Sequence, residues 1–154
     1  MTRALLPLLS SLAILAIAFG ADTAPDPWKP ADLIAPEVLA KAIQDKSAPL
    51  ILYVGFPVLY RAAHVPGAIF AGPGSKPEGL DALKAALASV PRDRDIVVYC
   101  GCCPWDRCPN VRPAFKLIKE LGYKNAKLVT IPTNVHTDWV SKGYPVEKSP
   151  AETK

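Results

Sequence analysis

Apolar residues along the chain gather in short unbroken runs, and these runs alternate with stretches of helical period. Residues 49–56, 95–100 and 126–131 are the clearest runs, and the second of them reads "DIVVYC". Runs of this length and β-branched character are typical of strands buried on both faces. A turn at Pro66–Gly67 followed by a brief apolar segment predicts one further short strand.

Three stretches carry apolar residues at intervals of three or four, which predicts amphipathic helices. Asn110 is expected to cap the start of the third helix, and Gly122 is expected to end it. Residues 137–146 predict a final short helix or turn. The three apolar stripes are Val38, Leu39, Ala42 and Ile43; Leu80, Leu83, Leu87 and Val90; and Val111, Ala114, Phe115, Ile118 and Leu121.

Strands that alternate with helices predict an α/β fold, with a mainly parallel central sheet between two layers of helices. The 154 residues are enough for one compact domain. In such sheets, ligands bind beyond the carboxyl ends of the strands. The segment that follows residues 95–99 is therefore the first place to look for a functional site.

The first 20 residues have the pattern of a targeting segment. A basic start at Arg3 is followed by an uncharged, mostly apolar run, and Ala18-Phe19-Gly20 has the small-x-small form of a cleavage site. We expect a signal peptide at residues 1–20 and a periplasmic or secreted protein; an uncleaved membrane anchor is the alternative. Residues 21–32 predict a Pro-rich linker or N-terminal arm, residues 33–148 the domain, and residues 149–154 a tail.

Charge and cysteine content narrow the possible functions. The net charge of +4 is spread along the chain without a basic stripe, so nucleic-acid binding has no support. All four cysteines lie within residues 100–108, in "CGCCPWDRC". Disulfides inside one loop close only small rings and stabilise little. The cluster therefore indicates chemistry rather than architecture, even in an oxidising compartment.

The position of Cys100 favours a reactive thiolate. It ends a predicted strand and is followed by a tight loop and the start of a helix. Backbone N–H groups, the helix dipole and the charge of Arg107 would each lower the pKa of a thiol there. We therefore expect the Cys100 sulfur to be ionised and reachable.

The chain resembles the rhodanese family of single-domain sulfurtransferases over residues 33–147. The resemblance is carried by "HVPGA" in residues 61–70, by "DIVVYC" with the later "ELGYKNAKLV", and by the closing "DWVSKGYPV". It implies a three-layer α/β/α fold, no cofactor, and a persulfide mechanism with Cys100 as the nucleophile. A small-molecule sulfur donor such as thiosulfate and a thiol acceptor would be its partners. The loop residues that would hold the anion are Gly101, Cys102, Cys103, Trp105, Asp106 and Arg107.

Three roles are open for Cys102, Cys103 and Cys108. In the first, they are resolving thiols, which attack a persulfide on Cys100; the pair Cys100–Cys103 has the C-x-x-C spacing of redox dithiols. Alternatively, a disulfide such as Cys103–Cys108 makes the loop rigid. A soft metal, copper(I) or zinc, is the third possibility, although one short segment is an unusual zinc site.

Two histidines and a second arginine are further candidates to lie around the cysteine loop. His136 is expected in a loop that faces the same sheet end, and His64 is expected as a hydrogen-bonded turn residue, with a role in proton transfer or as a ligand as the alternative. Arg112 is the fallback anion partner to Arg107. Trp105 is either a recognition surface or loop packing. The competing functional class is a non-enzymatic module that holds a soft metal or docks an exported partner protein, and a thiol–disulfide redox protein stands between the two.

Overall fold

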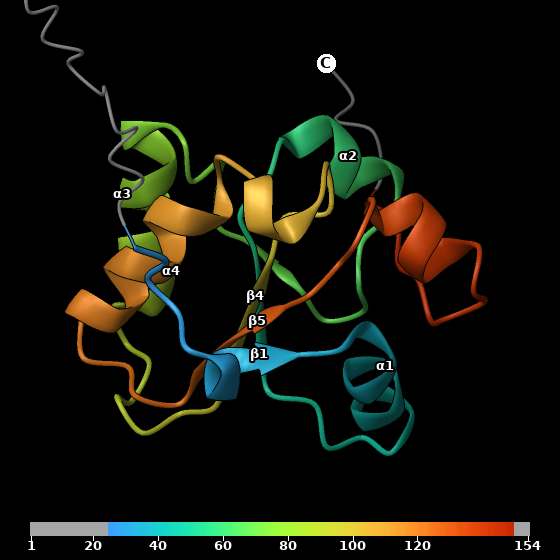
Figure 1. Ribbon diagram of the computed structural model, residues 1–154, viewed down its shortest axis with the longest axis horizontal. Coiled ribbons are helices and arrows are strands. Elements are labelled where there is room, and N and C mark those ends of the chain that lie inside the picture. The colour runs from blue at the N-terminus through green and yellow to red at the C-terminus, as the bar shows by residue number, and fades with distance from the viewer. Residues whose placement is uncertain (1–24, 150–154) are drawn as a thin grey trace, which may run out of the picture.

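The chain folds around one five-stranded sheet in which every strand pair is parallel (Figure 1). The computed structural model describes residues 25–149, so the predicted signal peptide at residues 1–20 and residues 150–154 of the predicted tail lie outside the described range. The strand order is β1-β5-β4-β2-β3, which puts β4 at the centre. The strands are β1 (Leu33–Ile34), β2 (Leu50–Tyr53), β3 (Ile69–Phe70), β4 (Ile96–Tyr99) and β5 (Ala126–Val129).

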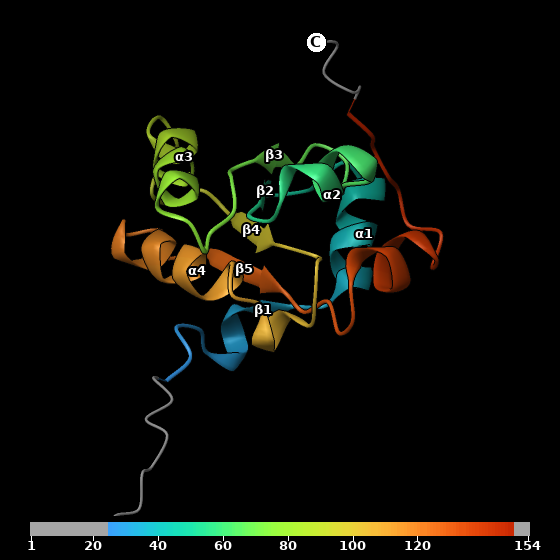
Figure 2. The same cartoon turned by 90° about the horizontal axis from the view of Figure 1, so that it is seen from above.

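Helices cover both faces of this sheet, which confirms the predicted three-layer α/β/α class. Figure 2 shows α3 and α4 on one side of the sheet, and α1 with the helix that follows β5 on the other. The α-helices are α1 (Pro36–Gln44), α2 (Pro57–Ala62), α3 (Pro77–Leu87) and α4 (Val111–Glu120). Two short 3-10 helices (Pro30–Asp32 and Trp105–Arg107) and one π-helix (His136–Val140) complete the fold.

The alternation of side chains along β4 explains why an unbroken apolar run is needed there. Val98 and Cys100 enter the core under α3 and α4, whereas Val97 and Tyr99 enter the core under α1. All four residues of β4 are buried. The strand therefore delivers Cys100 at its carboxyl end, facing the start of α4.

The N-terminal arm packs onto the α4 side of the domain. Trp28 is 8% exposed, and its ring centroid lies 5.6 Å from that of Trp105 and 6.0 Å from that of Phe115. The Arg112 guanidinium lies 5.0 Å above the Trp28 ring and forms an ion pair of 2.6 Å with Asp26. The arm thus braces the short helix that carries Trp105.

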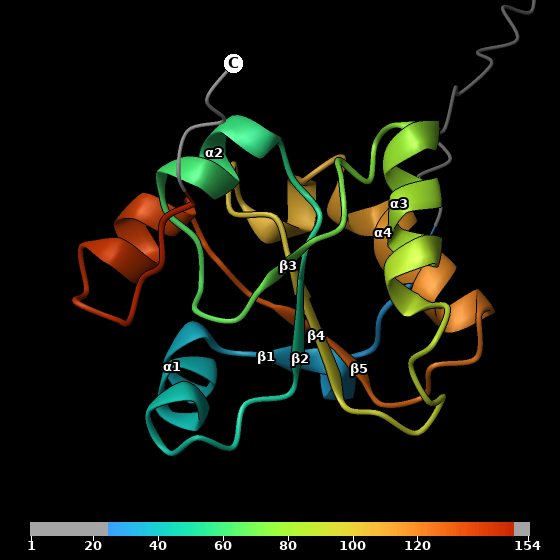
Figure 3. The ribbon, with the colours of Figure 1, turned by 180° about the vertical axis from the view of Figure 1, so that it is seen from behind.

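Two local expectations differ from the structure. Helix α2 was not predicted, because a single six-residue segment starting at Pro57 is too short to show a period. Val38 was placed in a buried stripe, but it is 54% exposed, and α1 buries Pro36, Leu39 and Ala40 instead. Figure 3 shows α2 toward the same end of the sheet as the carboxyl ends of β2 and β4.

Among residues 25–149, no helix combines the length and apolar character that a membrane crossing needs.

Candidate functional site

The cysteine loop leaves β4 through a sharp turn at Gly101. This glycine has φ of +80°, and a Cβ on it would lie 2.8 Å from the Cβ of Val135. The Val135 N–H donates to the Gly101 carbonyl at 2.9 Å, which ties the loop to the segment after β5. A larger residue would disturb both the backbone and this contact, so the glycine fixes the direction of the loop.

The four sulfurs meet beyond the carboxyl end of β4, and Cys102 lies at their centre. The Cys102 Sγ is 3.2 Å from the Cys100 Sγ, 3.2 Å from the Cys103 Sγ and 3.8 Å from the Cys108 Sγ. All four cysteines are free thiols in this structure. The sulfur in contact with Cys100 is therefore that of Cys102, whereas the C-x-x-C spacing had pointed to Cys103.

Burial divides the cluster into an inner and an outer pair. Cys100 is 2% exposed and Cys108 is 3% exposed, whereas Cys102 and Cys103 are half-buried. The loop after β2 closes over Cys100, since a Cβ on Gly55 would lie 2.9 Å from the Cys100 Sγ. The expectation of a reachable Cys100 sulfur is thus corrected: reagents in solution meet the outer pair first.

Asn110 supplies a buried amide to the sulfurs, a role that its sequence position did not reveal. It precedes α4 as expected for a cap, but its side chain makes no capping hydrogen bond. Its Oδ1 accepts the Ser75 N–H at 3.1 Å, which fixes the orientation of the amide because only the oxygen accepts. The Nδ2 group then donates to the Cys100 Sγ at 3.4 Å and approaches the Cys102 Sγ at 4.0 Å.

The thiols have unequal pKa values because they share hydrogen bonds. Hydrogen bonds from the Cys100 and Cys102 thiols, with backbone N–H groups of Asn110 and Val111, lower the pKa of Cys108 to about 2. Cys102 lowers the pKa of Cys100, but the hydrogen bond to Cys108 and burial outweigh it, and the pKa of Cys100 is raised to about 12. The start of α4 therefore favours negative charge on Cys108, rather than on Cys100 as expected.

The charged residues expected to hold an anion face away from the sulfurs. The Arg107 side chain is 85% exposed, and its Nε lies 4.0 Å from the carboxylate of Asp106. Arg112 is engaged with the N-terminal arm, as described above. Trp105 packs on Trp28 and so belongs to the loop packing. Neither Arg107 nor its fallback Arg112 is therefore directed at the Cys100 sulfur in this structure.

The two histidines also lie apart from the sulfur cluster. His64 is 5% exposed, its Nδ1 lies 2.7 Å from the Tyr60 carbonyl oxygen, and its ring stacks on the Tyr60 ring. Its Nε2 lies 3.7 Å from the Glu147 carboxylate. His136 is exposed at the start of the π-helix, one residue after Val135. His64 is thus a structural turn histidine.

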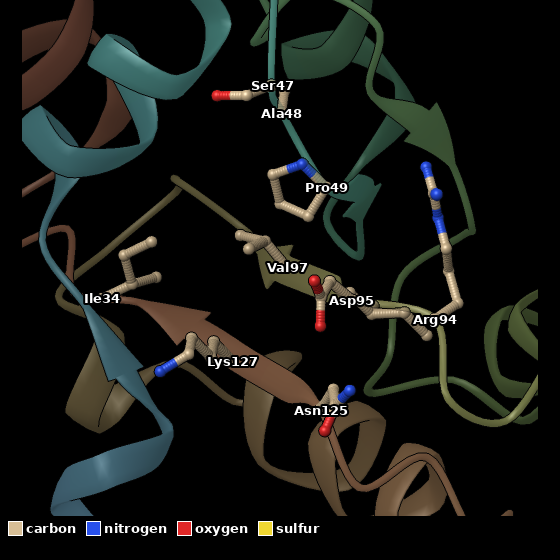
Figure 4. Close-up of a pocket in the computed structure, with 10 residues that line it drawn as sticks. Ile34, Ser47, Ala48, Pro49, Arg94, Asp95, Val97, Asn125 and Lys127 are labelled. Carbon is tan, nitrogen blue, oxygen red and sulfur yellow. The ribbon is translucent and has the colours of Figure 1, made fainter.

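A cavity of about 340 Å³ lies at the opposite end of the sheet from the sulfur cluster (Figure 4). It is lined by residues that precede or begin the strands, among them Pro49, Asp95 and Lys127. It contains no cysteine or histidine. The cavity is therefore separate from the sulfur cluster, which lies beyond the carboxyl end of β4.

The fold and the site together place this protein among α/β domains that carry a cysteine loop between the central strand of a parallel sheet and the following helix. The sequence model of the rhodanese-like domain matches residues 35–130. The chain belongs to the rhodanese-like domain family, as the resemblance in its motifs implied.

Solved structures with this fold come from several organisms. A rhodanese-like domain from Anabaena is 22% identical, with a TM-score of 0.56 over 80% of this chain and 87% of that one. A Bacillus halodurans protein is 20% identical, with a TM-score of 0.57 over 75% of both chains. A rhodanese-related protein from Thermoplasma volcanium is 20% identical, with a TM-score of 0.51 over 75% of this chain and 97% of that one. The comparison with curated proteins finds no match.

Proposed function

We propose that this protein is an exported sulfane-sulfur carrier that holds a persulfide on Cys100 and exchanges it through Cys102. One observation carries the proposal: the buried Cys100 sulfur lies 3.2 Å from the sulfur of half-buried Cys102. A sulfur atom received at the surface has a direct path to an interior position. Membership of the rhodanese-like family supports sulfur transfer as the type of chemistry.

The proposed reaction has three balanced steps. The Cys102 thiol gives its proton to the Cys108 sulfur, 3.8 Å away, and attacks the outer sulfur of thiosulfate; a sulfur–sulfur bond forms on the protein, sulfite leaves, and Cys108 releases the proton to solvent. The Cys100 sulfur then attacks the outer sulfur of this persulfide, and the proton of Cys100 passes to Cys102. Finally, the outer sulfur returns to Cys102 by the reverse of the second step, and an acceptor thiol takes it there while its proton passes to the Cys102 sulfur.

One group beside Cys100, the amide of Asn110, is placed to donate a hydrogen bond to a persulfide on that residue. The amide of Asn110 is held in its orientation by Ser75 before any sulfur arrives, so no reorganisation is needed to donate to the charged group. Hydrogen bonds to charged acceptors are worth about 1.5–3 kcal/mol. Burial also keeps water and stray reductants from the stored sulfur.

The location and partners belong to the same proposal. The pattern of residues 1–20 supports export to the periplasm or the exterior. There the carrier would receive sulfur from a small anionic donor and pass it to a small thiol or to an exported protein with a free thiol. Detection of the mature chain starting near residue 21 in a periplasmic fraction tests this part.

Intact mass spectrometry after incubation with thiosulfate tests the carrier function. Wild-type protein, stripped of metal, is expected to gain one sulfur atom that survives gel filtration. Cys100→Ser is expected to lose this retained sulfur, and Cys102→Ser to load more slowly. Cys103→Ser is the matched control, because Cys103 is also half-buried but contacts only Cys102 among the sulfurs recorded at contact distance. Retention of sulfur by Cys100→Ser at the wild-type level contradicts the proposal.

The contact between Cys100 and Cys102 also favours a second candidate function, thiol–disulfide exchange. If Cys102 attacks the inner sulfur of the Cys100 persulfide, hydrosulfide leaves and a Cys100–Cys102 disulfide forms. The mass then falls by two hydrogens instead of rising by one sulfur. Release of sulfide in step with that loss identifies this function.

A further inference from the structure

Three sulfurs of the cluster form a triangle that the sulfur-transfer scheme does not require. The Sγ atoms of Cys100, Cys102 and Cys108 all lie within 4.8 Å of one another. They come from the end of β4, the middle of the loop and the residues before α4, so separate parts of the fold bring them together. Within residues 25–149, these three cysteines form the one recorded group of three side chains whose possible metal-binding atoms lie this close together.

The size of the triangle fits one ion bound to three sulfurs. Metal–sulfur bonds of about 2.3 Å place three sulfurs about 3.8–4.0 Å apart around a shared centre. The distances here are 3.2 Å for Cys100–Cys102 and 3.8 Å for Cys102–Cys108. Shifts of less than about 1 Å, within the reach of a side-chain rotation, therefore produce the geometry.

The ligand set selects for a soft ion. No carboxylate or imidazole belongs to the group, so ions that prefer oxygen or nitrogen have no ligand in it. Zinc almost always takes four ligands in structural sites, and Cys103 lies outside the three sulfurs that converge. Thiolates suit copper(I), and a three-sulfur environment needs no further protein ligand.

The shell around the triangle is already arranged. The Asn110 amide, oriented by Ser75, donates toward two of the sulfurs. Groups that orient and hydrogen-bond metal ligands commonly change affinity by about 10–100-fold. Two of the three sulfurs are buried, while half-buried Cys102 gives an entry path from solvent.

We propose that reduced Cys100, Cys102 and Cys108 bind one copper(I) ion. The ion replaces thiol protons, which pass to solvent, and no electron is transferred. This site goes beyond the carrier function and competes with it, because sulfur loading and metal binding use the same sulfurs. The predicted metal set of Cys102, Cys103 and Cys108 is thereby changed at one position, with Cys100 in place of Cys103.

The site is tested by titrating the reduced protein with copper(I) under anaerobic conditions. A chromophoric chelator competes for the copper, and no sulfur donor is present. We expect one copper per chain. Cys100→Ser, Cys102→Ser and Cys108→Ser are each expected to weaken binding by at least about 100-fold, as the loss of one thiolate ligand implies. Cys103→Ser is the matched control and is expected to stay within a few-fold of wild type.

X-ray absorption at the copper edge of the wild-type protein gives a readout that does not depend on how the variants fold. Three sulfur neighbours at one distance are expected. Absence of one-to-one binding, two or more coppers per chain, or an equal loss in Cys103→Ser overturns the assignment of the ligands. Displacement of the copper by an equimolar amount of zinc overturns the choice of ion.

Discussion

Replacing Asn110 by aspartate reverses the polarity of one buried group while keeping its shape. The retained Oδ1 still accepts the Ser75 N–H, so the contact between the two loops is preserved. The group that faces the Cys100 Sγ at 3.4 Å changes from an N–H donor to a carboxylate oxygen. The variant therefore separates the electrostatic role of the amide from its packing role.

The magnitude follows from two terms. Loss of a hydrogen bond to a charged sulfur costs about 1.5–3 kcal/mol. A carboxylate oxygen at the same 3.4 Å from the Cys100 Sγ repels a full negative charge on that sulfur by about 5 kcal/mol at an effective dielectric constant near 20, and this is the upper limit for a charge on the outer sulfur of a persulfide. The first term alone corresponds to about 10- to 150-fold slower loading of Cys100. When the carboxyl group is protonated the repulsion disappears and its O–H can donate to sulfur.

The assay is the initial rate of sulfur loading from thiosulfate, followed by intact mass across a pH series. We expect Asn110→Asp to load at least about tenfold more slowly than wild type at alkaline pH. The ratio of the variant rate to the wild-type rate should rise as the pH falls, because protonation removes the opposing charge. Asn110→Ala is the comparison, since it also leaves the Ser75 N–H unpaired and loses stability by about 1–3 kcal/mol. A folded Asn110→Asp that loads at the wild-type rate at alkaline pH refutes this reasoning.

Three further substitutions test the frame around the sulfurs. Trp28→Ala, which removes an 8% exposed ring packed on Phe115, should lower the free energy of unfolding in urea by about 3–5 kcal/mol; a loss below 1 kcal/mol, roughly what a surface change gives, argues against the brace. Gly101→Ala, strained by φ of +80° and by contact with Val135, should cost about 1–3 kcal/mol in the same titration, and an unchanged midpoint contradicts that. Arg107→Ala should leave sulfur loading unchanged, because the side chain is 85% exposed; a clear fall in rate restores the arginine to the site.

The layers of the fold could be predicted from periodicity alone. The run at residues 95–100 is β4 followed by Cys100, and the stripe at residues 111–121 is α4, because both elements bury a regular face. Gly122, with φ of +88°, follows α4 as a helix-ending glycine should. An element that buries one face regularly needs apolar residues at regular intervals, so its position can be predicted from the spacing of those residues.

The site was only partly predictable, because its key properties come from contacts between distant segments. The carboxyl-edge position of Cys100 follows from the strand–loop–helix order, but its burial depends on Gly55, far along the chain. Asn110 looked like a helix cap, and only its contact with Ser75 reveals where its amide points. The packing of Trp28 could not be predicted either, because a single tryptophan in a Pro-rich arm forms no periodic apolar pattern.

The central place of Cys102 makes the whole cluster depend on its most vulnerable atom. The three sulfur–sulfur distances of 3.2, 3.2 and 3.8 Å recorded in the described part of the chain all include the Cys102 Sγ. Oxidation of that thiol beyond the sulfenic acid is irreversible in most proteins. Such oxidation of Cys102 would cut the two buried thiols, Cys100 and Cys108, off from the half-buried sulfur through which solvent reaches them, so the working lifetime of the cluster under oxidising conditions depends on this one side chain.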